Sequence, residues 1–215
     1  TIQEELLNEH DCKFYPPGLK IRIETIPLKE ICEINNGLNP GNVRHILISN
    51  EKITESHQKM VLGKDIKRYS LEWSGTWVNY DHSLKSTIKV SDIKSKPGMT
   101  AQTKVDFALR EESIYKGEKI LIRKTSDHII ASFDENEFYY DSLSYGIKIK
   151  QNSQLSIFFI LGLINSKLIN DIHETYSDNK DKVFAKVLAA NLARLPIPKI
   201  DFKDKNHKAK HDEIA

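Results

Sequence analysis

Short stretches that are either continuously apolar or alternate apolar with polar residues occupy the middle of the chain and predict β-strands. A turn-forming sequence at 124–127 separates two of these stretches and predicts a hairpin. Strands that follow one another through short turns favour an antiparallel or mixed sheet over repeated β-α-β units. The stretches expected to form strands are His45–Ser49, Thr76–Tyr80, Lys119–Arg123, His128–Phe133 and Tyr145–Ile149.

The last third of the chain changes to the helical spacing of apolar residues. Ser153–Asn165 is apolar almost all round, which predicts a buried helix that forms the spine of the core. Ser166–Tyr176 continues helically, with Leu168, Ile169 and Ile172 on one face. Residues 205–215 begin another helical pattern, whereas 195–198 (Leu-Pro-Ile-Pro) must be extended because each proline disfavours the α conformation in the residue before it.

Near the other end, Pro27 is expected to start a short helix that turns Leu28, Ile31 and Cys32 inward. Together these elements predict a mixed α/β (α+β) fold. In it, a twisted, mainly antiparallel sheet from residues near 40–150 packs on the helices at 153–176 and 205–215.

The sequence Tyr15-Pro16-Pro17-Gly18 is typical of a linker exit, so we expect a linker over 1–18 and one domain over 19–215. The chain opens at Thr1 and its last helical pattern stops at Ala215. We therefore expect a piece of a longer protein whose terminal helix is cut.

Composition narrows the class of protein but names no partner. The 215 residues are 39% hydrophobic and 29% charged, as in ordinary globular domains, and 32 basic against 30 acidic residues leave a net charge of +2. Cys12 and Cys32 lie far apart in a chain without a signal peptide, which indicates reduced thiols and a cytoplasmic location. The apolar run Leu155–Leu163 is far shorter than the ~20 residues of a membrane span, so no membrane partner is expected.

The motifs of the common catalytic sites are absent from the sequence. It has no Gly-x-Gly-x-x-Gly, Walker or Gly-x-Ser-x-Gly sequence, and its nearest approach to a methyltransferase Asn-Pro-Pro-aromatic loop is the linker sequence at 15–18. His173-Glu174 lacks the second histidine of a zinc site, so His173 is expected to be a surface or core residue.

A metal-dependent nuclease is a weak alternative. Acidic-x-Lys pairs of the kind such enzymes use occur about as often as chance predicts. They begin at Asp11, Asp65, Asp92, Asp178 and Asp201.

Positive charge is concentrated locally. Lys59–Tyr69, Lys85–Lys104 and Lys116–Lys124 carry net charges of +3, +4 and +3, and acidic residues gather at 134–141. If the fold brings the basic stretches to one side, they form a phosphate-binding surface; the alternative is that they are solvated loops.

The hairpin tip Arg123–His128 carries donors suited to phosphates and base edges, although a plain polar turn has the same composition. Trp73, Trp77 and Tyr139-Tyr140 could stack on bases but are expected in the core. The candidate DNA-binding residues, with Lys64 and Arg68 on backbone phosphates, are Lys64, Arg68, Lys96, Lys104, Arg123, Lys124, Ser126 and His128.

Several segments, in order, resemble the TaqI-like C-terminal specificity domain. That family is the target-recognition module of type II adenine-specific DNA methyltransferases and of restriction enzymes fused to them. The segments are Val61–Tyr69 with its Gly-Lys-Asp-Ile-Lys-Arg-Tyr, Lys119–Lys124, Ile129–Ala131, Tyr140–Leu143, Leu163–Leu168, Phe184–Val187, Asn191-Leu192, Leu195–Pro198 and His211–Ala215. Pro27–Cys32 with Asn36–Leu38 also resembles the opening of type I specificity-subunit recognition domains, whereas Lys85–Ile114 matches nothing in the family.

The resemblance implies a domain that recognises double-stranded DNA without catalysis or a cofactor of its own. The S-adenosylmethionine site and any nuclease would lie in an upstream methyltransferase domain of the same parent chain. In this family, variable stretches such as 85–114 carry the sequence preference. The alternative is a protein-interaction module of a restriction specificity-subunit assembly, with Ile197-Pro198 and the terminal helix as docking surfaces.

Overall fold

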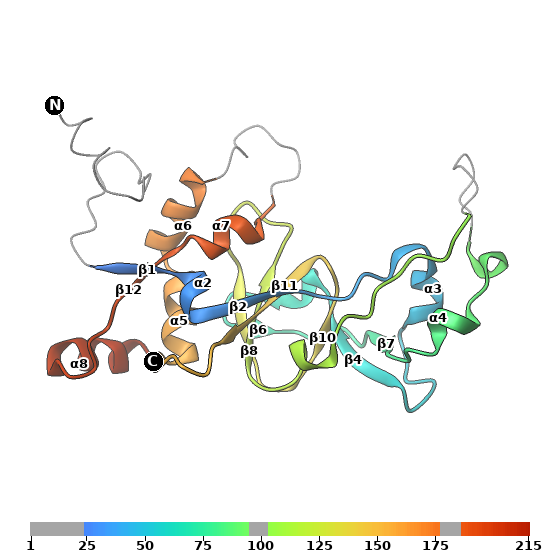
Figure 1. Ribbon diagram of the computed structural model, residues 1–215, viewed down its shortest axis with the longest axis horizontal. Coiled ribbons are helices and arrows are strands. Elements are labelled where there is room, and N and C mark those ends of the chain that lie inside the picture. Colours follow the sequence, from blue (N-terminus) through green and yellow to red (C-terminus); the bar gives the residue numbers. More distant parts are fainter. Residues whose placement is uncertain (1–23, 95–102, 177–185) are drawn as a thin grey trace.

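The computed structural model describes residues 24–94, 103–176 and 186–215. The linker expected over 1–18 therefore lies outside the described residues, as do Cys12 and Lys96. The molecule is elongated, with α5, α6 and α8 at one end, α3 and α4 at the other, and the sheets between them (Figure 1). The mixed α/β class expected from the sequence is confirmed.

Two four-stranded sheets replace the single sheet expected from the sequence. The first is fully antiparallel, in the order β2-β11-β8-β9. Its strands are β2 (Cys32–Asn36), β8 (Lys119–Arg123), β9 (Ala131–Asp134) and β11 (Ser144–Ile149).

The second sheet has the order β10-β4-β7-β3, and its β10–β4 pair is parallel. Its strands are β3 (Ile48–Ser49), β4 (His57–Val61), β7 (Trp77–Asn79) and β10 (Tyr139–Tyr140). Two further strand pairs are β1 (Thr25–Pro27) with β12 (Pro196–Pro198) and β5 (Ile66–Lys67) with β6 (Ser70–Leu71).

Alternation along β8 explains why there are two layers. Ile120 and Ile122 face the helical core, whereas Leu121, between them, packs in a second core with Met60 and Tyr140. A strand with both faces buried needs a cover on each side, and the second sheet supplies the second cover.

The helices are short except at the C-terminal end. Their bounds are α2 (Leu28–Ile31), α3 (Arg44–Leu47), α4 (Leu84–Thr87), α5 (Ile157–Ile164), α6 (Lys167–Thr175), α7 (Ala189–Ala193) and α8 (Lys205–Ile214). Four 3₁₀ turns are η1 (Gly41–Val43), η2 (Gly63–Asp65), η3 (Val90–Asp92) and η4 (Glu112–Ile114).

The buried helix predicted at 153–165 is confirmed as α5, but it begins at Ile157. The Ser156 side chain caps it by accepting from the Phe158 N–H. Phe159, Ile160 and Ile164 are buried in the main core, so α5 is its spine as expected.

The expectations for α3 and α6 were wrong in part. His45–Ser49 was expected to be a strand, but Arg44–Leu47 is helical because Val43 and Leu47, four residues apart, both pack into a third core beside α3. On α6, Ile169 and Ile172 are buried as predicted, whereas Leu168 faces solvent.

The core positions expected for Tyr139 and Tyr140 are confirmed, whereas Trp73 and Trp77 are only half-buried. Tyr139 and Tyr140 are buried and His173 is buried on α6, while Trp73 and Trp77 form an edge contact with ring centroids 5.4 Å apart. Burial raises the pKa of the Cys32 thiol to about 12, which makes it an unreactive core residue.

The docking surface expected at Ile197-Pro198 was wrong for Ile197. Ile197 is fully buried, and it pairs with Ile26 across the β1–β12 ladder. Its side chain therefore belongs to the chain's own core.

The predicted hairpin between β8 and β9 is confirmed, with a longer loop than expected. Arg123 N–H donates to Ile130 O at 3.0 Å, so the loop spans 124–129 instead of 124–127. Ile129 leaves the ladder because its side chain is buried in the main core and its N–H donates to Asn170 Oδ1 at 2.7 Å.

This register places Lys119 directly opposite Asp134. Their side chains form a fully buried ion pair at 2.7 Å, and Lys119 also donates to Tyr115 O. Lys119 was counted in a basic surface stretch and Asp134 in an acidic one, and both counts were wrong because the pair lies in the core.

Candidate nucleic-acid interface

The turn between β10 and β11, Asp141–Ser144, is the centre of the candidate site. The Ser144 N–H donates to Asp141 O at 3.0 Å, which closes a β-turn. The Ser142 N–H donates to Leu38 O at 2.7 Å, so the segment after β2 lies beside this turn.

Two cations contact the turn directly. Arg44 at the start of α3 places Nη1 3.7 Å from Asp141 Oδ2. Lys124 Nζ donates to Ser142 O at 3.2 Å and to Asn36 Oδ1 at 3.3 Å, and it lies over the Tyr145 ring.

Gly63 in η2 lies against the turn and against the side chain of Arg123. A Cβ built on Gly63 would lie 3.6 Å from Leu143 O and 3.7 Å from Arg123 Cγ, so η2 packs against both. Lys64 follows Gly63 in η2 and is exposed. We call Arg44, Lys64, Arg123 and Lys124, gathered around Asp141–Ser144, the turn cluster.

The carboxylates beside the turn cluster are buried. Asp141 accepts from the Leu143 N–H at 3.0 Å, and burial raises its pKa, which the Leu143 N–H and Arg44 partly oppose. Asp65 is also buried and accepts from the Leu62 N–H at 2.9 Å. The surface around the turn therefore presents cations to solvent.

Ser126 and His128, also predicted to bind DNA, lie at the hairpin tip with a carboxylate between them. Asp127 is 82% exposed and lies 2.5 Å from His128 Nδ1, and this hydrogen bond lowers the pKa of Asp127. The tip is therefore less positive than Arg123 and Lys124 alone suggested.

Arg68, another predicted phosphate contact, has a partner inside the chain. Its Nη2 donates to the carbonyl of Asn165, the C-cap of α5, at 3.1 Å. A cation at a helix C-terminus stabilises the helix, so this contact gives Arg68 a structural role.

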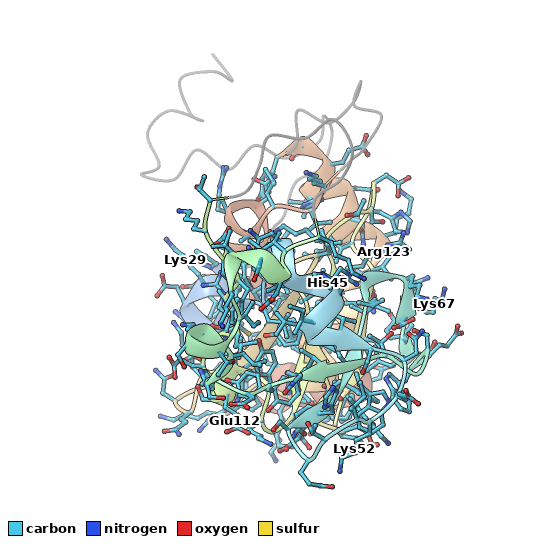
Figure 2. All side chains as sticks on the ribbon, turned by 90° about the vertical axis from the view of Figure 1, so that its right-hand side faces the viewer. Lys29, His45, Lys52, Lys67, Glu112 and Arg123 are labelled. Atoms are coloured by element: carbon cyan, nitrogen blue, oxygen red, sulfur yellow. The ribbon has the colours of Figure 1, made fainter. Side chains whose placement is uncertain are left out.

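The three basic stretches converge only in part. Those at 59–69 and 116–124 meet through Lys64, Arg123 and Lys124, whereas Lys59 lies over the Trp73 ring. Lys104 is exposed beside η1, where its carbonyl accepts from Asn42 Nδ2, and Lys85 is exposed on α4 at the same end of the molecule (Figure 1). Figure 2 looks at this end and places Arg123 in the upper right part of the molecule and Lys52 near the lower edge.

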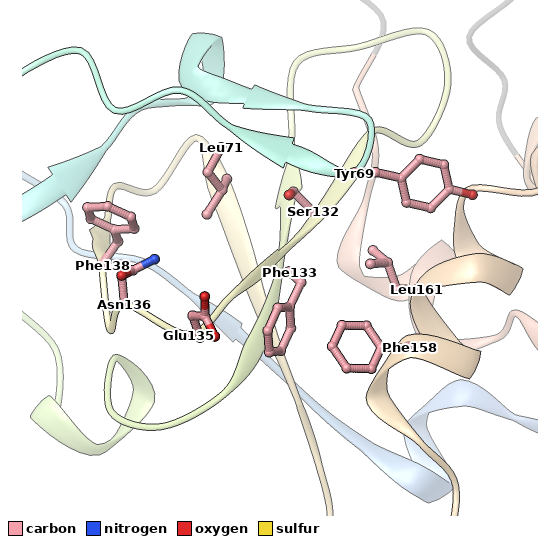
Figure 3. Close-up of a pocket in the computed structure, with 9 residues that line it drawn as sticks. All are labelled: Tyr69, Leu71, Ser132, Phe133, Glu135, Asn136, Phe138, Phe158 and Leu161. Carbon is pink, nitrogen blue, oxygen red and sulfur yellow. The ribbon is translucent and has the colours of Figure 1, made fainter. Parts of the chain in front are cut away.

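A surface hollow of about 540 Å³ lies away from the turn cluster, where β6 and β9 meet α5 (Figure 3). Phe133, Phe158 and Leu161 make much of its lining apolar, and Tyr69 projects at its edge. Glu135 and Asn136 add polar groups, without a nucleophile and base pair that would suggest catalysis.

Within 24–94, 103–176 and 186–215, side chains of histidine, cysteine, aspartate and glutamate form no group of three that could hold a metal ion. The helices in these ranges are also too short or too polar to cross a bilayer.

Sequence reasoning missed Arg44 and overlooked Leu143 as a site residue. Arg44 precedes a stretch that was expected to be a strand, and only its helical turn brings it to Asp141. Leu143 was noted only within a family motif. The signal that could have found it is a leucine in the polar turn sequence Asp-Ser-Leu-Ser.

Comparison with known proteins gives a match to one family and matches to solved structures, among them the following two. The family model of the TaqI-like C-terminal specificity domain matches residues 58–197, well over half of the chain. One solved match, from work on complex assembly and conformational transition of the type I R-M system, is 12% identical over 93% of this chain and 40% of that chain, with a TM-score of 0.49.

The other is the HsdS subunit from Thermoanaerobacter tengcongensis, 12% identical over 94% of this chain and 40% of that chain, with a TM-score of 0.47. The chain thus spans less than half the length of either protein. A comparison with curated protein sequences gives no match.

Proposed function

Because the chain belongs to the family of TaqI-like C-terminal specificity domains, we propose that it binds double-stranded DNA through the turn cluster and selects the target sequence of a restriction-modification enzyme. The observation that carries this proposal is the gathering of Arg44, Lys64, Arg123 and Lys124 around one tight turn. Guanidinium and ammonium groups bind the phosphates of a duplex.

The parent enzyme proposed here is an adenine-specific DNA methyltransferase, alone or fused to an endonuclease, in the cytoplasm. Such an enzyme flips adenine out of the duplex, which costs a few kcal/mol of stacking energy. A separate recognition domain supplies binding energy and sequence choice. S-adenosylmethionine would bind the methyltransferase domain upstream, whose Asn/Asp-Pro-Pro-aromatic loop should be encoded before Thr1; a gene without it would contradict this parent.

DNA binding is tested by titrating a labelled duplex with the 215-residue chain at increasing salt. We expect affinity to fall steeply with salt, because each phosphate contact releases condensed counterions. Lys64→Ala combined with Lys124→Ala should weaken binding and flatten the salt dependence. No binding at low salt, or binding that ignores salt, would overturn the proposal.

The matched control is Lys52→Ala combined with Lys116→Ala. These two lysines line a different hollow and are about as exposed as Arg44. The control should bind like the unmodified chain, and a loss equal to that of the turn variant would mean that binding is not localised at the turn cluster.

A further inference from the structure

We propose that Leu143 reads DNA sequence at this surface by apolar contact with the C5-methyl group of thymine in the major groove. The inference rests on the proposed function, because it assigns a role within the same interface. It adds an apolar, specificity-determining residue to an interface that so far consists of cations.

Leu143 is the third residue of the Asp141–Ser144 turn, and its side chain is 53% exposed. Two residues of the turn cluster adjoin it: the Lys124 N–H donates to its carbonyl at 2.9 Å, and Gly63, next to Lys64, approaches the same carbonyl. A surface that brings these cations to phosphates would therefore bring Leu143 to the duplex as well.

The backbone of Leu143 is fixed on both sides. Its N–H donates to Asp141 Oδ1 at 3.0 Å, its carbonyl accepts from the Lys124 N–H, and the Ser142 N–H before it donates to Leu38 O. The backbone that carries the side chain is thus fixed before any ligand arrives, which reduces the entropy lost on binding.

The fold gives little reason for leucine at this position. A turn of this kind favours polar residues, and half-exposed apolar surface contributes little to folding. Phosphate contacts carry no sequence information, and an arginine such as Arg123 at a base edge reads guanine, so reading thymine requires a further, apolar group. The thymine methyl is the apolar group that the major groove offers, and leucine complements it.

Insertion between base pairs is the other role open to an exposed leucine on a DNA-binding surface. A wedge must project deeply from its element, whereas Leu143 lies in a turn whose backbone is hydrogen-bonded closely to Leu38 and Lys124. These restraints favour contact with the groove edge over insertion.

The test begins by selecting duplexes from a random-sequence pool with the unmodified chain. The selected duplex is then remade with uracil in place of each thymine in turn, which removes only the C5-methyl group. At one or more positions the unmodified chain should lose about fourfold in affinity, the value of roughly one buried methyl group. Leu143→Ser should bind the thymine and uracil duplexes equally, and Leu143→Met should keep the discrimination.

Ile53→Ser is the matched control, because Ile53 is 65% exposed and follows Lys52, which lies at the lower edge of Figure 2, away from Arg123. It should discriminate like the unmodified chain. The inference is overturned if Leu143→Ser still discriminates between the thymine and uracil duplexes, or if the selected duplex lacks thymine. It is also overturned if 2-aminopurine placed in the duplex reports base unstacking while the uracil substitutions have no effect. Salt-dependent binding in those cases leaves the proposed function standing, whereas failure to bind any duplex overturns both.

Discussion

At the scale of single residues, the turn cluster contains two kinds of cation. Arg123 is partly buried and its Nε donates to Thr125 O at 2.8 Å, which fixes the plane of the guanidinium. Lys64 is exposed on η2. A fixed, planar donor suits a base edge, whereas a flexible ammonium suits a phosphate.

Substituting these two cations should therefore have different effects. Arg123→Ala should cost ~1–3 kcal/mol and relax base preference at one position, as expected for an arginine on guanine. Lys64→Ala should weaken binding to all duplexes and reduce the salt slope by about 1. Anisotropy titrations with the selected duplex and a scrambled one measure both effects. Unchanged affinity for Arg123→Ala would remove Arg123 from the site.

The buried ion pair of Lys119 and Asp134 contributes to the stability of the fold and has no part in the proposed DNA binding. Burial lowers the pKa of Lys119 and raises that of Asp134, and each charge opposes the shift in the other. Lys119→Met should lower the free energy of unfolding by about 3–5 kcal/mol, because it leaves a buried carboxylate without its cation. Urea denaturation of Lys119→Met and of Lys119→Met with Asp134→Leu checks this. The double variant should regain stability, and a double variant as unstable as the single one would contradict this account.

At the scale of elements, the C-terminal end of α5 is tied to the β8–β9 hairpin. The Asn165 side chain accepts from the Ala131 N–H at 3.1 Å and donates to the Ala131 carbonyl at 2.9 Å. The same carbonyl accepts from the Tyr69 N–H, and Arg68 binds the Asn165 carbonyl. The segments that resemble the family at Arg68, Ala131 and Asn165 therefore contact one another.

These contacts predict that Arg68 contributes to the stability of the fold. Arg68→Ala should lower the free energy of unfolding by about 1 kcal/mol, and Asn165→Ala by about 2 kcal/mol, because the latter removes both hydrogen bonds to Ala131. Neither variant should change the salt slope of duplex binding by the folded chain. Chemical denaturation and salt titration of the same samples measure the two effects. A reduced salt slope in Arg68→Ala would restore Arg68 as a phosphate contact.

The same elements show how far the sequence predicts this structure. The short apolar run of β8 and the long apolar run of α5 were placed correctly because both patterns are local to their elements. The hairpin loop was longer than expected because Ile129 is held by Asn170, a partner on α6 that no local pattern announces. Lys64, Arg123 and Lys124 follow from composition and motif, whereas Arg44 joins them only through the packing of the segment after β2 on the β10–β11 turn.

At the scale of the whole molecule, the turn cluster borders the main core at one point, because Lys124 lies over the ring of Tyr145, a residue of that core. Most of the main core lies under α5 and α6, at the opposite end of the molecule from α3 (Figure 1). Residues of that helical end can therefore affect stability without contact to the turn cluster. In mild acid, we expect the stability of the chain to depend mainly on one buried titratable residue at this helical end.

That residue is His173 on α6. It is buried, and its Nε2 has no hydrogen-bond partner among the described residues. Burial lowers the pKa of His173 below the ordinary value of 6.5, so at pH values just below 6.5 the unfolded chain binds a proton that the folded chain does not. The free energy of unfolding should therefore fall as the pH drops below 6.5, by up to about 1.4 kcal/mol per pH unit, until the folded histidine is also protonated.

Urea denaturation of the unmodified chain and of His173→Gln between pH 7.5 and 5.5 isolates this effect. The pKa values of Asp134 and Asp141 are raised in the folded state, which by itself makes stability increase on acidification. Both carboxyls are present in both proteins, so the difference between the two curves reports His173 alone. We expect the stability of the unmodified chain relative to His173→Gln to decline steadily below pH 6.5. Parallel curves would mean that His173 takes up its proton equally in the folded and unfolded states, and the packing of α6 described above would then have to be wrong.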